Sequence, residues 1–352
     1  MPSVAAHLAP GIAEDVLGLP SAKRYVVLLV DGLGWDALFD PATEAPALRG
    51  MTSSRLVCGL PSTTAASLPA LTTGEPALRH GVVGFSFRTR PGFIMNTMAW
   101  DDACSSPEDV QRMPTWFERL ATAGVPCAAV APGIFAGSGL TRAYLRGAGF
   151  VGVPDEKNWS ARAGQVADVA GTHQLTYVYE RGLDHVAHLR GWRSNAWQKK
   201  LTAIDRFVGV LRDVLPTGTG LLVTGDHGVV DVPKTHRLLI EHEPELADGV
   251  DMAGGEARLC HLYTDQPEAV ARRWREFLGS RAEVRLRADA LDWFGDGTPD
   301  ESVSQRLGDV VVAMLDDWAV LTTRRPAEVS LVGMHGSLTP AERGVPLLKE
   351  VV

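Results

Sequence analysis

Cysteine is scarce in this chain, and none of it stands in a pattern that builds a metal site or a disulfide framework. Four cysteines occur in 352 residues, with no pair at CxxC spacing: Cys58, Cys104, Cys127 and Cys260. Zinc and redox motifs depend on such spacing, and small secreted domains carry cysteine at far higher density. We therefore expect reduced thiols, mostly buried, and no cysteine-ligated metal.

Long hydrophobic runs are also missing. No stretch approaches the ~18 consecutive apolar residues of a membrane-spanning helix. Residues 1–20 contain neither a basic n-region nor an apolar block of the length found in secretory signal peptides. The sequence therefore predicts no membrane span and a cytoplasmic location.

Positive charge is in deficit. Lys and Arg total 34 against 42 Asp and Glu, which gives a net charge of -8 and a pI near 5.7. Proteins that bind nucleic-acid polymers usually present a basic face, so we expect no such partner. The apolar fraction of 45% is ordinary for a globular protein, and the length allows two domains or one large α/β domain with an insertion.

What the chain does contain is a set of short apolar runs that end in polar residues. Three of them are Tyr25–Val30, Leu175–Glu180 and Gly220–Thr224. Runs of this length bounded by turn residues predict buried strands of a mostly parallel sheet, and hence an α/β fold. Ligands of such sheets bind at the carboxyl ends of the strands. Asp and His follow these runs at that end.

The remaining pattern predicts further helices, strands and an insertion. Helices are expected within 61–74, around 115–123 and over 197–214, strands at 127–131 and 345–352, and irregular structure over 80–102. The hydrophobic pattern changes between residues 241 and 325, where short apolar runs flank a predicted Arg-rich amphipathic helix. We predict a catalytic core of 1–240 and 326–352, with 241–325 as an inserted small α+β subdomain.

Six carboxylate and imidazole side chains form a candidate metal centre. They are Asp31, Asp184, His188, Asp226, His227 and His335. Each of these residues alone has a plainer interpretation: an aspartate in a turn before glycine, a capping pair on a helix, or a loop histidine whose ring nitrogens are hydrogen-bonded. Taken together, three Asp and three His suit Zn²⁺ and its first-row neighbours and supply two sites of three ligands each. The neighbouring Asp36 and His185 are expected to be bystanders.

A hydroxyl near Thr64 completes this candidate set. The hydroxyl-rich segment before the alanines of 61–74 predicts a helix N-terminus there. A helix N-terminus favours an anion, and a metal ion would lower the pKa of the hydroxyl and make it a nucleophile.

The order of these motifs resembles the alkaline phosphatase superfamily and, within it, the nucleotide pyrophosphatase/phosphodiesterase family. The shared motifs are Asp31 after the first strand, Pro61-Ser-Thr-Thr64, Asp184-x-x-x-His188, Asp226-His227-Gly228 and His335-Gly336. The spacing from Thr64 to Gly74 and to His80-Gly81 selects Thr64 over Thr63. Any one motif is weak, but five in order are specific. The resemblance implies a three-layer α/β/α sandwich of the alkaline-phosphatase type.

The resemblance also implies the ligands and the reaction. One metal ion would be held by Asp31, Thr64, Asp226 and His227, and the other by Asp184, His188 and His335. Both ions are expected to be divalent, most simply zinc. Thr64 would attack phosphorus and form a phospho-threonine intermediate, and the substrate would be a small-molecule phosphodiester or nucleotide pyrophosphate.

Two departures from the family pattern bear on the substrate. Ala65-Ala66-Ser67 stands where the family usually has Phe-Pro-Asn, and Phe85 stands where it has an Asn that contacts phosphate. Asn96 is a candidate replacement for that amide.

Three other functions remain open at this point. A phosphomonoesterase or phosphonate hydrolase is compatible with the same scaffold, although no basic residue is fixed beside Thr64. A dimetal phosphomutase fits the Asp-x-x-x-His spacing less well. A non-catalytic metal-binding module would be expected to have lost some of the seven positions. We further expect the insertion to contact the leaving group, as insertions above strand ends do.

Overall fold

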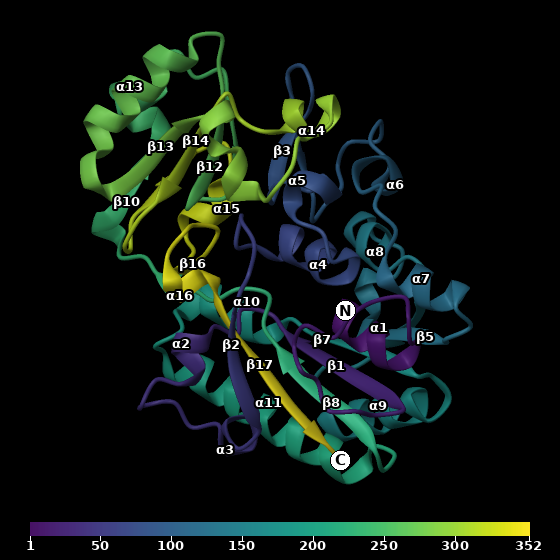
Figure 1. Cartoon of the computed structure of the whole chain (residues 1–352). Helices are drawn as coiled ribbons and strands as arrows, with labels where there is room; N and C mark the ends of the chain where they lie inside the picture. Colours follow the sequence, from purple (N-terminus) through teal and green to yellow (C-terminus); the bar gives the residue numbers. More distant parts are fainter.

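A seven-stranded sheet organises the computed structural model, which describes residues 1–352 (Figure 1). Its order is β2-β17-β8-β1-β7-β5-β6. The strands are β1 (Arg24–Val30), β2 (Thr52–Val57), β5 (Cys127–Pro132), β6 (Gly149–Val153), β7 (Leu175–Glu180), β8 (Thr219–Thr224) and β17 (Gly344–Val351). Only β17 runs antiparallel to its neighbours, so the predicted mostly parallel sheet is confirmed.

Helices cover both faces of this sheet. One face packs against α3 (Pro46–Arg49), α9 (Trp159–Thr172), α10 (Gly182–Arg190) and α11 (Asn195–Val214). The other packs against α1 (Pro2–Leu8), α4 (Thr64–Thr73), α7 (Trp116–Thr122) and α8 (Gly139–Tyr144). Side chains alternate along a strand, so Val26 and Leu28 of β1 enter the first core while Tyr25 and Val27 enter the second. The three-layer α/β/α sandwich is confirmed.

A second, antiparallel sheet lies beside the main one. Its order is β11-β12-β14-β13, formed by Met252–Gly255, Leu259–Tyr263, Val310–Met314 and Ala282–Leu286. α13 (Pro267–Leu278) covers one face, where Trp274 is fully buried. α5 (Ala77–His80), α14 (Glu301–Arg306) and a hairpin of β3 (Ser86–Arg90) and β4 (Phe93–Asn96) pack on the other face.

The hairpin corrects the expectation that 80–102 is irregular. Phe87 of β3 and Met95 of β4 enter the core beneath the second sheet, and Pro91-Gly92 make the turn, with Gly92 at φ +74°. The strands are five and four residues long, with a register shift after Arg88, and are too short to show a clear alternation in the sequence.

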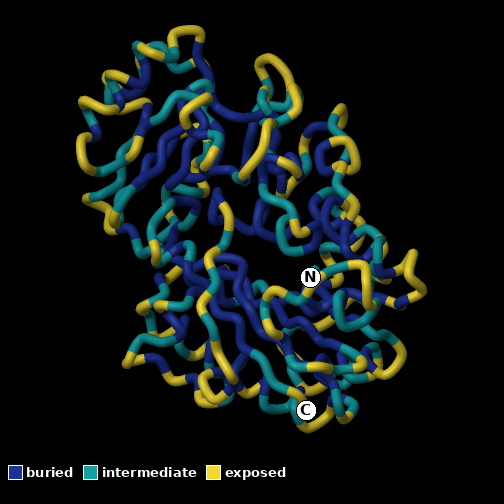
Figure 2. The backbone as a smooth tube through the Cα atoms, in the orientation of Figure 1, coloured by how far each residue is buried: buried dark blue, intermediate teal, exposed yellow.

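Shorter elements connect these parts. They are α2 (Trp35–Leu38), α6 (Pro107–Val110), α12 (Pro244–Ala247), α15 (Pro326–Val329), α16 (Pro340–Arg343), β9 (Val230–Asp231), β10 (Arg237–Leu239), β15 (Ala319–Leu321) and β16 (Gly333–Met334), with several 3₁₀ turns. The central strands β5, β7 and β8 of the main sheet and β12 and β14 of the second sheet are buried along their whole length (Figure 2). None of the helices combines the length and the apolar character that crossing a bilayer requires.

The second sheet lies within the segment 241–325, but some of the elements that pack on it, such as the β3–β4 hairpin, lie outside that segment. Ser86 Oγ of β3 donates a hydrogen bond to Gly255 O of β11 at 3.0 Å. The division into a core of 1–240 and 326–352 with an inserted 241–325 stays a prediction.

Candidate active site

Three adjacent strands bring the predicted aspartates to one edge of the main sheet. β1 pairs in parallel with both β7 and β8, and Val30 lies opposite Glu180. Asp31 follows β1, Asp226 follows β8, and Asp184 lies in the first turn of α10, which follows β7. All three aspartates are buried, so three carboxylates share the carboxyl end of the sheet.

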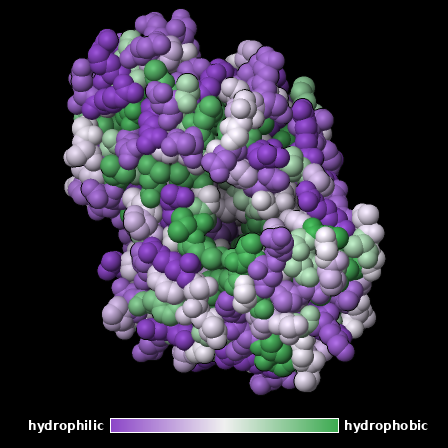
Figure 3. All heavy atoms as spheres, in the orientation of Figure 1, coloured by the Kyte–Doolittle hydropathy of each residue, from purple (hydrophilic) through white to green (hydrophobic).

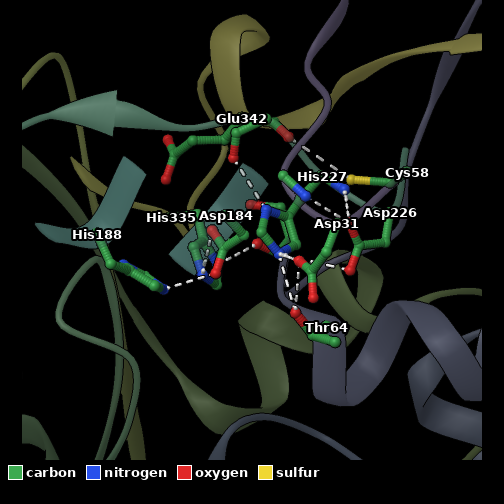
Figure 4. A network of polar contacts seen from close by, with 12 residues as sticks. Asp31, Cys58, Thr64, Asp184, His188, Asp226, His227, His335 and Glu342 are labelled. Atoms are coloured by element: carbon green, nitrogen blue, oxygen red, sulfur yellow. Dashed lines mark hydrogen bonds and ion pairs between the residues drawn. The ribbon is translucent and has the colours of Figure 1, made fainter. Parts of the chain in front are cut away.

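Thr64 reaches the same place from the start of α4. The segment before it is fixed to a distant loop, because Ser62 N donates to Gly336 O at 3.0 Å. Thr64 Oγ1 lies 3.2 Å from Asp31 Oδ1 and 3.1 Å from His227 Nε2. Figure 4 shows the hydroxyl pointing into the cluster of carboxylates and imidazoles.

The three predicted histidines are held in a common way. Each imidazole Nδ1 lies within hydrogen-bond distance of a backbone carbonyl, which can only accept. The pairs are His188 with Gly333 O at 2.7 Å, His227 with Gly228 O at 3.0 Å and His335 with Ser62 O at 3.0 Å. Nδ1 therefore carries a proton in each pair, and Nε2 is the atom that a metal ion at the centre would bind. Metal-binding histidines are oriented by this kind of outer hydrogen bond.

Asp184 lies between two groups of possible ligands. Its Oδ2 is 3.0 Å from His188 Nε2, and its Oδ1 is 4.0 Å from His335 Nε2. Ligand atoms of Asp184, His188 and His335 lie within 4.8 Å of one another, and so do those of Asp31, Asp184 and His227. The rings of His227 and His335 stack with centroids 3.7 Å apart. All seven predicted residues thus lie in one continuous cluster.

Burial and mutual charge set the protonation of this cluster. Burial raises the pKa of Asp31 well above its usual value, and the carboxylates of Asp226 and Asp184 raise it further. Burial also acts to raise the pKa of Asp184, but His188 and then His335 lower it below its usual range. Burial acts to lower the pKa of His188, yet Asp184 raises it to about 9.

The cluster is chemically suited to divalent cations. Asp184 Oδ1 and Asp226 Oδ2 are buried and make no hydrogen bond. A buried carboxylate oxygen without a partner is costly unless a cation meets it. Hard carboxylate oxygens and borderline imidazole nitrogens are together a donor set for zinc-like ions. The residues present therefore fit a two-metal centre.

Most of the chain matches one known protein family. A sequence profile described as "Type I phosphodiesterase / nucleotide pyrophosphatase" matches residues 25–338, which include every predicted site residue. The chain belongs to this family. The family identifies it as a hydrolase of phosphoesters within the alkaline phosphatase superfamily, as the sequence motifs predict.

Solved structures of low sequence identity share the fold of this phosphodiesterase-family chain. Human ectonucleotide pyrophosphatase/phosphodiesterase 5 aligns at TM-score 0.74 and 14% identity, over 93% of this chain and 87% of the other. Phosphonoacetate hydrolase from Sinorhizobium meliloti 1021, in complex with phosphonoformate, aligns at TM-score 0.70 and 18% identity, over 94% and 91%. At these identities the likeness establishes the fold alone. A search of curated protein sequences found no match.

A hollow opens beside the cluster of this family member, with about 430 Å³ of free space. Nine residues line it: Thr63, Phe85, His188, Glu256, Ala257, Glu328, Leu331, Met334 and His335. Figure 3 shows that the molecular surface is hollowed between the region of the main sheet and that of the second sheet, with hydrophobic residues along the rim. The hollow is mostly apolar, with carboxyl groups on its wall.

Asn96 is not among the residues that line this hollow, and its role as a replacement for the family amide stays a prediction. Asn96 Oδ1 accepts the N–H groups of Met98 and Ala99 at 2.9 and 3.3 Å, in the turn after β4. Short-range backbone bonding of this kind is what asparagine commonly does in turns. Phe85, in contrast, does line the hollow.

Some residues of the site escaped the sequence motifs. Tyr179 donates its hydroxyl hydrogen bond to Asp31 Oδ2, and Gly32 N donates to Asp226 Oδ1 at 3.0 Å. Tyr179 lies opposite Leu29 of β1. Its contact with Asp31 therefore follows from the register of the two strands, and no sequence motif indicates it. The two expected bystanders lie outside the cluster, since Asp36 pairs with Arg55 at 3.5 Å and His185 is exposed.

Adding Zn²⁺ to chelator-treated protein is expected to raise the melting temperature, because a cation binds the unpartnered carboxylate oxygens only in the folded state. At a free concentration of 100 Kd the gain is about 2.7 kcal/mol per site. Thermal unfolding with and without zinc measures it. We expect Asp226→Asn to reduce the shift and Asp36→Asn, at an exposed position, to keep it. Equal shifts in both variants would contradict the location of the metal centre.

Proposed function

We propose that the chain is a dimetal hydrolase that cleaves a phosphodiester or nucleotide pyrophosphate bond through a phospho-threonine intermediate on Thr64. The observation that carries the proposal is the position of Thr64 Oγ1, 3.2 Å from Asp31 Oδ1 and 3.1 Å from His227 Nε2 at the start of a ten-residue helix. A hydroxyl in contact with a carboxylate and an imidazole is placed as an activated nucleophile.

The proposed metal ligands are those of the family resemblance. Asp31, Thr64, Asp226 and His227 would hold one divalent ion, and Asp184, His188 and His335 the other. We propose zinc because the donor set mixes carboxylate with imidazole. When bound, such ions act as Lewis acids that lower the pKa of a coordinated hydroxyl and stabilise charge on phosphoryl and leaving oxygens.

The side chains of the protein then account for the two steps. Thr64 Oγ1 loses its proton and attacks phosphorus, so that an Oγ1–P bond forms while the bond from phosphorus to the leaving oxygen breaks. In the second step a water oxygen bonds to phosphorus, the Oγ1–P bond breaks and Thr64 recovers a proton. The first N–H groups of α4 have no partner within the helix and favour the anionic phosphoryl group.

The walls of the hollow favour a diester over a monoester. A monoester carries an additional negative charge, and enzymes that prefer it commonly add Lys or Arg near the phosphoryl oxygens. None of the nine residues that line the hollow is Lys or Arg. The structure of an inactive murine ectonucleotide pyrophosphatase/phosphodiesterase 5 in complex with AMP supports a small nucleotide as substrate.

Phosphonate hydrolysis is the second candidate, supported by the shared fold of phosphonoacetate hydrolase. The carboxylate of phosphonoacetate needs a cationic partner, whereas neither Lys nor Arg lines the hollow of this chain. We therefore rank the diester first. The predicted cytoplasmic location stays a proposal.

Thr64→Ala is expected to abolish turnover of bis-p-nitrophenyl phosphate, by about 10³-fold or more, because the attacking oxygen is removed. Bound metal, measured on the same sample, should remain. Thr72→Ala is the matched control: Thr72 lies buried in the same helix, and its hydroxyl donates to the backbone carbonyls of Leu68 and Pro69 within that helix. Full activity of the Thr64 variant would overturn the assignment of the nucleophile.

We expect kcat/KM for bis-p-nitrophenyl phosphate to exceed that for p-nitrophenyl phosphate by about tenfold or more, since the hollow has no cation for the additional charge of the monoester. Both rates are followed by the release of p-nitrophenol from the zinc-loaded protein. A preference for the monoester would favour a phosphomonoesterase on this scaffold.

A further inference from the structure

Two carboxyl groups on the wall of the hollow, those of Glu256 and Glu328, have no role in the proposed metal centre. Apart from His188 and His335, the polar side chains that line the hollow are Thr63, Glu256 and Glu328. Glu256 directly follows β11 and is only 5% exposed. A carboxyl group so deeply buried needs either a cation or hydrogen bonds.

Glu256 is only half satisfied by the protein. Its Oε1 accepts the N–H of Phe85 at 2.5 Å, whereas its Oε2 is buried without any hydrogen-bond partner. Glu256 forms no ion pair, because no side-chain nitrogen of a Lys, Arg or His lies within 4.0 Å of its carboxyl oxygens. One oxygen of Glu256 is thus held in place and the other is left free.

The nearest cation is engaged elsewhere. Arg325 Nη1 donates to Ser86 Oγ at 2.9 Å and to Gly255 O at 2.6 Å. Its Nε lies 3.3 Å from Glu328 Oε1. The guanidinium of Arg325 therefore attracts Glu256 only at a distance, while the carboxylate of Glu328 repels it.

The free carboxyl group is close to the start of α4. The side chain of Glu256 packs against two glycines. A Cβ atom added to Gly336 would lie 2.9 Å from Glu256 Cβ, and a Cβ atom added to Gly84 would lie 3.5 Å from Glu256 Oε2. Gly336 is in turn bonded to Ser62, two residues before Thr64. A side chain at Gly336 would collide with Glu256, so this glycine lets Glu256 pack against the loop of His335, in the hollow that Thr63 also lines.

We propose that Glu256 contacts the substrate as a neutral carboxylic acid and donates a hydrogen bond from Oε2 to a non-bridging phosphoryl oxygen. A protonated carboxyl has one O–H to give, and phosphoryl oxygens can only accept it. A donor fixed in a dry site gains strength as charge develops on that oxygen in the transition state. This inference rests on the proposed function and names a substrate contact for the same site.

Burial supports the neutral form. It raises the pKa of Glu256 to about 8, against the lowering effects of the Phe85 N–H, of Arg325 and of the Thr63 hydroxyl, and Glu328 adds to the rise. The donor is therefore lost as the pH rises through the pKa of this carboxyl group. An amide in the same position would keep its donor throughout.

The test compares Glu256→Gln, which keeps a donor, with Glu256→Ala, which removes it. For bis-p-nitrophenyl phosphate we expect kcat/KM to fall about 10²-fold in the Ala variant and to stay within a few-fold of wild type in the Gln variant at pH 7. The ratio of wild-type to Gln activity should fall between pH 6 and pH 9. Glu241→Gln is the control, since Glu241 accepts the Thr323 N–H at 2.9 Å outside the hollow and its ratio should stay flat.

A second measurement does not require turnover. Calorimetric titration of inorganic phosphate into the zinc-loaded protein should show Kd raised about tenfold in the Ala variant and little changed in the Gln variant. If the wild type hydrolyses no phosphoester, the proposed function fails, and the phosphate titration still decides the role of Glu256.

Two results would overturn the proposal. Wild-type phosphate affinity in the Ala variant would show that Glu256 does not contact the phosphoryl group. Equal losses in the Gln and Ala variants would show that the group acts as a carboxylate or in folding. Thermal unfolding separates these two, because a folding defect lowers the melting temperature of both variants.

Discussion

The crowding of three buried carboxylates at one edge of a sheet is the constraint on which the rest of the site depends. Asp31, Asp184 and Asp226 lie where like charges repel and water cannot screen them, and burial with this repulsion raises the pKa of Asp31. Two of their oxygens have no hydrogen-bond partner. A divalent cation would relieve this repulsion and meet the two unpartnered oxygens, so the cluster fits the proposed metal centre better than a purely structural core.

The fold fixes this arrangement through backbone geometry rather than through long side chains. The parallel pairing of β1 with β7 and β8 places the strand ends side by side. Carbonyl groups orient all three imidazoles through Nδ1, and the bridge between Ser62 and Gly336 ties the start of α4 to the loop of His335. A nucleophile on a helix end and ligands on strand ends are thus held by rigid elements, as precise chemistry requires.

The sequence allowed the sheet, its layers and the position of the cluster to be predicted, because apolar runs and the residues that follow them are local signals. Strand ends in a parallel sheet meet at one edge, so Asp31 and Asp226 could be placed together without coordinates. The packing of the β3–β4 hairpin beneath the second sheet and the contact of Tyr179 with Asp31 depend on register and packing between distant segments. No sequence motif includes Glu256. Its proposed contact with substrate rests on a buried carboxyl oxygen that has no hydrogen-bond partner, and only the folded structure shows this.

The number of metal ions bound by wild type and by Asp31→Asn tests the central claim most directly. Elemental analysis of the purified protein should give about two zinc-like ions per chain for the wild type, as two-metal sites require. In Asp31→Asn it should give about one, retained by Asp184, His188 and His335. The absence of metal from the wild type after zinc loading, or the loss of both ions from the variant, would contradict the proposed centre and its division into two ligand sets.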